Sequence, residues 1–295
     1  MKKQIDAFKQ YLIVEKKSSA NTVESYLRDL LQFSSYCASL KISNVQKVKT
    51  ETINNYMDYL ASQGKSEATK ARISSSIRAF YRYLINIGAV MDNPVNAANK
   101  SKVEKKLPGV LDSSEIILLL SQPSGNDYKS IRDKAMLELL YATGIKVSEL
   151  LNLRVQDFNM QLGILHLSSG KKERIIPIYP AAVKSLTDYL INVRPAIVLE
   201  PTQDKLFTNI NGAQMSRQGF WKLIKHYAAQ AGIKEEITPH TLRHSFAAHL
   251  LENGANLQDI KEMLGHSDIS STQIYAQYIK NKYAANYTRF HPLAK

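Results

Sequence analysis

Residues near the carboxyl end of the chain could together carry out chemistry on a phosphate ester. His240 and Arg243 lie three positions apart. His266 follows a glycine, and Tyr275 comes nine residues later. An arginine neutralises phosphate well because its planar guanidinium matches two phosphate oxygens, and histidines add hydrogen bonds or carry protons. A tyrosine oxygen that loses its proton can attack phosphorus and form a phosphotyrosine ester. The residue types therefore predict a transesterification that conserves bond energy and needs neither ATP nor a metal.

Two other kinds of site fit parts of the same sequence less well. His240 and His244 have the four-residue spacing of a zinc-binding helix, but no glutamate base lies between them and Arg243 adds an adverse charge. The segment Gly170-Lys-Lys172 resembles the end of a nucleotide-binding loop. The earlier glycine of that loop is missing, however, and no serine or threonine follows the lysine. We therefore expect no metal and no cofactor.

Two predicted helices position these residues. A proline directly after Thr238 is typical of a helix start, with the threonine as N-cap. His240 and Arg243 then share one face of this helix because they are three residues apart. A second helix is expected over Leu257–Leu264, and the glycine that ends it places His266 just past the helix end.

The amino-terminal 98 residues predict a helical bundle. Apolar residues recur at helical spacing, Ser19 or Asn21 can cap the second helix, and no strand-like alternation is visible. Lys, Arg, Ser, Thr and Asn side chains are frequent, which suits contact with phosphates, although a plain packing module has the same composition. The expected helices cover Gln4–Val14, residues 19–33, Thr50–Ser62 and Ser66–Ile87.

A polar, charged and proline-bounded stretch divides the chain. We expect a domain over residues 1–98, a linker over 99–110, a second domain over 111–280 and a tail over 281–295. The whole chain is predicted to be mainly α-helical with a small antiparallel β-sheet.

The second domain contains the β-signal of the sequence. Residues 163–169 alternate, a turn follows, and residues 174–178 return as a second strand, in which Pro177 indicates an edge position. Helices are expected before this hairpin, and the chain after it is helical. The expected helices before the hairpin cover Glu115–Leu120, Arg132–Thr143 and Val147–Leu153.

The charge favours a nucleic-acid partner. The 39 Lys and Arg against 26 Asp and Glu give a net charge of +13 and a pI near 9.5. Such a protein often binds nucleic acid, although a basic surface can also serve solubility. The chain has no apolar run long enough for a membrane span and no signal peptide, and it has one cysteine, Cys37. These features predict a cytoplasmic protein with no membrane contact.

The motifs resemble those of the tyrosine recombinases, the phage-integrase family, and most closely the bacterial Xer-type enzymes. The resemblance rests on the order and spacing of His240-Thr-Leu-Arg-His244, Leu264-Gly-His-Ser-Asp268 and Thr272-Gln-Ile-Tyr275. It extends over essentially the whole chain, through residues 8–33, 141–150, 172–177 and the tail at His291-Pro292. It implies a two-domain DNA clamp, with a helical SAM-like core-binding domain and an α+β catalytic domain.

The resemblance also implies roles for individual residues. Tyr275 is the nucleophile, with Tyr278 one helical turn further on as the alternative. Arg243, His240 and His266 bind the scissile phosphate, and Glu149 supports the site. A hairpin lysine protonates the leaving 5′-hydroxyl, with Lys171 as the first choice and Lys172 as the second. Arg217, Lys222 and Arg174 are expected to contact DNA. Packing is the default role of Trp221, and packing or capping is the default role of His244 and His249.

Two departures from the family pattern affect the expected activity. The family usually has arginine where this chain has Lys146, which keeps the charge but loses the two-pronged phosphate contact. The hairpin turn is one residue shorter than usual and lacks the first lysine in its usual place. These departures raise an alternative, a degenerate relative that binds DNA but cleaves it poorly. A swivelling topoisomerase is a third reading.

The expected partners follow from the resemblance. Each subunit cuts one strand of double-stranded DNA, and recombining two duplexes takes four cuts. A homo- or hetero-tetramer on DNA is therefore implied. Its subunits are expected to be joined by exchange of the C-terminal tail. The implied roles are chromosome-dimer resolution, which serves chromosome partition and cell division, or integration and excision of a mobile element. A second recombinase and a septal DNA translocase are further implied partners.

Overall fold

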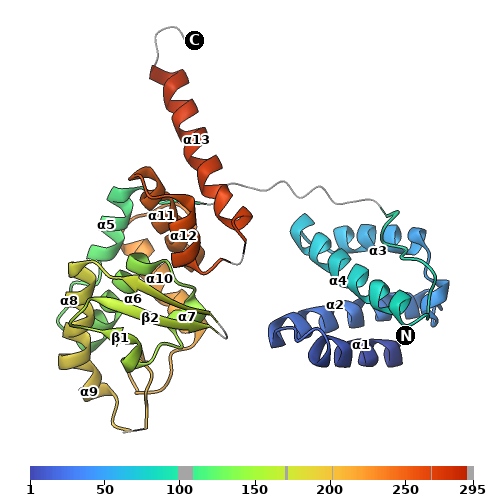
Figure 1. Ribbon diagram of the computed structural model, residues 1–295, viewed down its shortest axis with the longest axis horizontal. Helices are drawn as coiled ribbons and strands as arrows, with labels where there is room; N and C mark the ends of the chain where they lie inside the picture. Colours follow the sequence, from blue (N-terminus) through green and yellow to red (C-terminus); the bar gives the residue numbers. More distant parts are fainter. Residues whose placement is uncertain (99–108, 170–171, 201, 267, 291–295) are drawn as a thin grey trace. The chain divides into compact units, whose positions relative to one another are not determined.

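The computed structural model describes residues 1–98, 109–169, 172–200, 202–266 and 268–290, without the side chains of 169, 172, 270 and 283–290. The chain divides into two compact units, Met1–Lys105 and Lys106–Lys295 (Figure 1). The division falls inside the segment where we expected a linker. A clamp formed by the two units around DNA stays a prediction.

The first unit is a bundle of four helices, as the periodicity predicts. Two of the helices begin at serine caps. The Oγ of Ser19 accepts from the amide of Thr22, and the Oγ of Ser66 accepts from the amide of Thr69. Rings and aliphatic side chains from all four helices, including Phe8, fill the core. The helices are α1 (Lys2–Val14), α2 (Ala20–Ser39), α3 (Thr50–Ser62) and α4 (Glu67–Asn86).

A buried carboxylate ties α2 to α4 in this unit. Asp29 is 1% exposed and accepts a hydrogen bond of 2.7 Å from the Oγ of Ser76. It also forms an ion pair with Arg72. Because a buried charge without partners is strongly destabilising, this contact favours the observed pairing of the two helices.

The second unit contains helices around a small sheet. α6 is its central helix, because most of its residues are buried, and it packs against both α8 and α11. Its helices are α5 (Ser113–Ser121), α6 (Tyr128–Thr143), α7 (Val147–Leu150), α8 (Pro180–Asp188), α9 (Arg194–Ile197), α10 (Arg217–Gln230), α11 (Pro239–Glu252), α12 (Leu257–Leu264) and α13 (Ser270–Phe290). Helix α7 is shorter than the predicted helix over 147–153, and α13 continues through the boundary expected at residue 281.

The sheet is antiparallel with the strand order β1-β2-β3, where β1 is Phe158–Asn159, β2 is Ile164–Ser169 and β3 is Lys172–Pro177. Leu165 pairs with Ile176, and both side chains face the core. Strand β3 lies at the edge, as Pro177 indicates. The sequence gives no signal for β1, because two residues are too few for an alternating pattern. The prediction of a mainly helical protein with a small antiparallel sheet is confirmed.

Helix α11 joins the central core to a smaller one. It packs against α6, α12 and α13, and the smaller core contains Phe246, Ile260, Leu264 and Tyr275. Of the helices within the described ranges, none has the length and apolar character needed to cross a membrane.

Candidate active site

The start of α11 brings two predicted site residues to one face. The Oγ1 of Thr238 accepts from the amide of Thr241 at 3.2 Å, and Pro239 occupies the first helical turn, as predicted. His240 and Arg243 follow three residues apart, and both line the same cavity.

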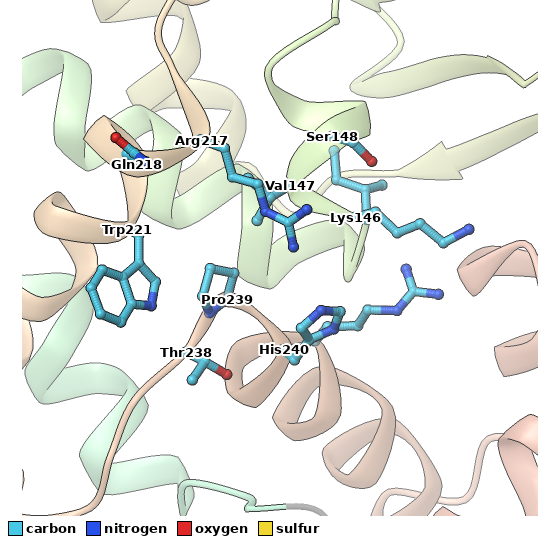
Figure 2. A pocket seen from close by; sticks show the side chains of 11 residues that line it. Lys146, Val147, Ser148, Arg217, Gln218, Trp221, Thr238, Pro239 and His240 are labelled. Carbon is cyan, nitrogen blue, oxygen red and sulfur yellow. The ribbon is translucent and has the colours of Figure 1, made fainter. Parts of the chain in front are cut away.

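The cavity has a volume of about 740 Å³ and a basic lining. Figure 2 shows Lys146, Arg217 and His240 reaching into it from three different segments of the chain. No aspartate or glutamate is among the described residues that line it. A concave surface with cations and no carboxylates attracts anions such as phosphate. The lining residues are Ile145, Lys146, Val147, Ser148, Arg217, Gln218, Trp221, Thr238, Pro239, His240 and Arg243.

Arg243 is held in place by the ends of two helices. Its Nη1 donates to the carbonyl of Gly144 at 2.6 Å, and its Nη2 donates to the carbonyl of Leu264 at 2.8 Å. These carbonyls lie at the C-termini of α6 and α12, where the helix dipole favours a cation. Burial lowers the pKa of Arg243, whose side chain is 4% exposed, although it stays a strong base. The guanidinium is therefore fixed before any substrate arrives, with further N–H groups left for a phosphate.

Glu149 connects α7 to the β-hairpin. Its Oε2 accepts from the backbone amide of Lys146 and from the Nη2 of Arg174, both at 2.8 Å. Burial opposes the charged form, but the hydrogen bonds from Arg174 and Lys146 lower the pKa of Glu149 below its ordinary value. Arg174 also donates from Nε to the carbonyl of Met263 at 2.9 Å. These bonds make Arg174, whose side chain is 13% exposed, a link between β3, α7 and α12. Its expected DNA contact stays a prediction.

His266 lies just past the end of α12, as predicted. Gly265 ends the helix with a positive φ of 66°, and the Nδ1 of His266 lies 3.0 Å from the Oγ1 of Thr272. Its Nε2 therefore remains for a substrate. Burial lowers the pKa of His266 to about 4, and the nearby charges of Arg243 and Lys146 act in the same direction. The ring is neutral at pH 7.

His240 has a similar electrostatic environment at the cavity. Partial burial lowers its pKa, and Arg217 and Arg243 lower it further. A neutral imidazole beside these two cations can donate one hydrogen bond and accept another.

Tyr275 lies beneath α11 and is not among the residues that line the cavity. The side chain is 1% exposed and packs in the small core with Phe246 and Leu264. Burial raises the pKa of Tyr275, and the charge of Arg243 opposes that rise. The Oη of Tyr275 lies 2.9 Å from the Nδ1 of His244. His244, for which packing or capping was expected, is therefore also the hydrogen-bond partner of this hydroxyl among the described residues.

Sequence reasoning missed His244 because its partner is 31 residues away. Local spacing says which residues share the face of one helix, but it does not say which helix packs against that face. The companion expectation for His249 fits a structural role, because this residue is buried and its Nδ1 lies 2.9 Å from the Oη of Tyr141.

The other residues predicted for the site differ in exposure and in their position relative to the cavity. Lys222 is exposed on α10 but does not line the cavity, whereas Arg217 at the start of α10 does. Trp221 is 39% exposed at the cavity, with the Nζ of Lys225 at 3.8 Å from its ring centroid, so it is not a core residue. Tyr278 is half-buried. Lys171 and the side chain of Lys172 lie outside the described residues.

Within the described ranges, no three His, Cys, Asp or Glu side chains gather closely enough to hold a metal ion.

Comparison with protein families gives two matches. The model of the phage integrase family matches residues 110–282, and the model of the phage integrase N-terminal SAM-like domain matches residues 5–88. A Staphylococcus epidermidis protein named tyrosine recombinase XerD is 42% identical over 291 residues, which cover 98% of this chain and 99% of that protein. A Staphylococcus aureus protein of the same name is 40% identical with the same coverage.

Solved structures have the same fold. The crystal structure of XerA recombinase is 26% identical and has a TM-score of 0.55, covering 98% of this chain and 99% of that chain. The XerH recombinase bound to palindromic difH substrate, in a post-cleavage complex, is 20% identical and has a TM-score of 0.76. It covers 92% of this chain and 81% of that chain.

Proposed function

This chain belongs to the phage integrase family and is a Xer-type site-specific tyrosine recombinase, and from this premise we propose how its own residues cleave and rejoin DNA. The Oη of Tyr275 attacks the scissile phosphorus, the bond from phosphorus to the 5′-oxygen breaks, and a 3′-phosphotyrosyl ester forms. A free 5′-hydroxyl of the partner strand then attacks this ester, which reverses the chemistry and releases the tyrosine.

The phosphate is bound in the basic cavity. Arg243 binds two of its oxygens with the N–H groups that the helix-end carbonyls leave available. His240 donates to the same phosphate, and His266 uses the Nε2 that its contact with Thr272 leaves exposed. These groups are already in place, so they stabilise the charge that develops in the transition state with little rearrangement.

A hairpin lysine supplies the proton for the leaving 5′-oxygen. We assign Lys171 to this role first and Lys172 second. In support, Ser169 pairs with Lys172, so Lys172 begins β3 at the turn end of the hairpin. Two residues further on, Arg174 forms an ion pair with Glu149, which joins β3 to α7 and to Lys146 at the start of that helix.

One observation carries the proposal. A cavity lined by cations and free of described carboxylates receives Arg243 and His240 from α11, and the hydroxyl of Tyr275 lies beneath the same helix. The net charge of +13 suits a double-stranded DNA substrate. Arg217 and Lys222 on α10 are assigned to DNA contact, with Arg174 as a third candidate.

We also propose the assembly. One tyrosine cuts one strand, so exchange between two duplexes uses four subunits on DNA, either identical or shared with a second recombinase. Residues 281–295 are assigned to contact with a neighbouring subunit. Such an assembly would act in the cytoplasm in chromosome-dimer resolution, with a septal DNA translocase as a further partner, or in the movement of a mobile element.

The test is capture of the covalent intermediate. The protein is incubated with nicked suicide substrates from a library of candidate sites, and the attached peptide is mapped by mass spectrometry. We expect the adduct on Tyr275, its loss in Tyr275→Phe, and its retention in the matched variant Tyr278→Phe.

An adduct that persists in Tyr275→Phe contradicts the assignment. Strand exchange between two labelled duplexes separates a recombinase from an enzyme that only relaxes supercoiled DNA.

A further inference from the structure

Helix α11 carries both the phosphate-binding groups and the group that contacts the nucleophile. His240 and Arg243 line the basic cavity, and the next residue, His244, contacts the hydroxyl of Tyr275 on α13. His244 lies one turn after His240, so the two rings are neighbours, with their centroids 6.3 Å apart. The phosphate-binding groups and the group that holds the nucleophile therefore lie on one rigid element.

The contact between His244 and Tyr275 is partly buried. The Oη lies 2.9 Å from the Nδ1, the rings are 5.6 Å apart between centroids, and Tyr275 is 1% exposed. His244 is the hydrogen-bond partner of this hydroxyl among the described residues. A buried hydroxyl without a partner is unfavourable, so the contact stabilises the position of the ring beneath α11.

The surroundings of His244 keep its ring uncharged. Burial lowers the pKa of His244 to about 4, and nearby His240 and Arg243 act in the same direction. The hydrogen bond is therefore one between neutral groups across the physiological pH range.

In this conformation the hydroxyl of the nucleophile is not exposed in the cavity. The cavity is lined by Arg243 and His240 but not by Tyr275, whose side chain is 1% exposed and whose hydroxyl contacts His244. The attack assigned to Tyr275 thus requires its hydroxyl to leave His244.

We propose that His244 is a positioning residue that holds Tyr275 in a resting place beneath α11, and that loss of this hydrogen bond precedes attack on phosphorus. The proposal rests on the function assigned above, since it concerns the regulation of the same site. Removing the bond raises the fraction of molecules whose tyrosine is free, and the rate of covalent attachment rises with that fraction.

The first test compares two nearly isosteric substitutions. In His244→Leu no partner for the hydroxyl remains, whereas in His244→Asn the side-chain amide can occupy the place of Nδ1. We expect His244→Leu to form the covalent adduct on a nicked substrate about 5- to 10-fold faster than wild type, the effect of one buried hydrogen bond. His244→Asn should stay within about twofold. A His244→Leu rate equal to or below that of wild type would overturn the proposal.

The second test uses the protein without DNA. Tetranitromethane nitrates accessible tyrosines, and mass mapping reports each tyrosine separately. We expect Tyr275 to be nitrated several-fold faster in His244→Leu than in wild type or His244→Asn, with Tyr278 as the internal control that does not change. Equal protection of Tyr275 in all three proteins contradicts the proposal.

Should His244→Leu fail to fold, Tyr275→Phe decides the question, because it removes one oxygen atom from the contact. We expect the Nδ1 resonance of His244 to shift in Tyr275→Phe, and wild type to shift in the same direction when suicide-substrate DNA is added. An unchanged resonance in either case overturns the proposal. If the assigned function is wrong, the covalent adduct still forms in Tyr275→Phe. The nitration and resonance experiments, by contrast, report only on the contact between His244 and Tyr275.

Discussion

At position 146 the cavity carries a lysine, where the family resemblance of the sequence leads us to expect an arginine. The backbone of Lys146 is well fixed, because its amide donates to Glu149 at the start of α7. Its side chain is exposed at the cavity beside Arg243 and His240. A lysine provides a compact point charge, whereas an arginine provides a planar fork that binds two phosphate oxygens. The loss of the second phosphate contact matters most in the transition state, because the phosphate carries most charge there.

We expect Lys146→Arg to accelerate covalent attachment on the order of 10- to 100-fold, since it adds a charge-assisted contact of about 1.5–3 kcal/mol. The affinity for uncleaved DNA should change little because the net charge is the same. Single-turnover adduct formation on a nicked site measures the rate, with Lys146→Ala as the control that should be slower than wild type. No gain in rate for the arginine variant would show that this position does not limit cleavage.

Among the elements, the end of α6 has a direct role in placing Arg243. Gly144 ends this helix with a positive φ of 56°, and its carbonyl accepts from the guanidinium. A Cβ at this position would lie 2.3 Å from the Cδ1 of Phe246. Gly232, after α10, also has a positive φ of 65° but open space around it. Comparing alanine substitutions at the two glycines therefore distinguishes the cost of a left-handed backbone from the cost of crowding against Phe246.

We expect Gly232→Ala to lower the free energy of unfolding by about 1–2 kcal/mol, the cost of a left-handed residue with a side chain. Gly144→Ala should lose about 1–3 kcal/mol more because Phe246 must move. The adduct rate should fall in Gly144→Ala alone, since its carbonyl positions Arg243. Urea unfolding and adduct kinetics of both variants provide the measurements. Equal losses of stability would rule out a role for crowding at Gly144.

Local signals predicted most of these elements. Ser19 and Thr238 act as N-caps, Gly144 and Gly265 end their helices, and the hairpin forms where alternation predicts it. Each of these signals depends on neighbours within a few residues. The sequence therefore also predicted that His240 and Arg243 share a face.

Contacts between distant elements were not predictable in the same way. Glu149 and Arg174 are 25 residues apart, and Tyr275 meets His244 across two helices. The charge of Arg174 was interpreted as available for DNA, because the sequence does not reveal the partly buried carboxylate of Glu149 opposite it. The burial of Tyr275 likewise depends on how α13 packs, and its helical pattern alone does not determine this.

For the molecule as a whole, the dominant property is positive charge. The chain has a net charge of +13, and its second unit contains the basic cavity, to which α10 contributes Arg217. Binding to DNA through phosphates releases counterions, so affinity depends steeply on salt.

We expect Arg217→Ala to weaken DNA binding and to reduce the slope of log affinity against log salt by about 0.9 for the phosphate contact that is lost. Lys184→Ala on α8 removes the same charge from a helix that does not line the cavity, and its slope should remain that of wild type. Binding isotherms over a range of salt concentrations measure both. Identical slopes in the two variants would place Arg217 outside the DNA interface.

Helix α13 carries Tyr275 near its start and continues to Phe290 without a break. At 1.5 Å per residue, the helix extends roughly 22 Å beyond the tyrosine. Because the helix is continuous, a small tilt at its far end also tilts the turn that carries Tyr275. We therefore expect a partner bound at that end, such as the neighbouring subunit proposed above, to influence when Tyr275 attacks its strand.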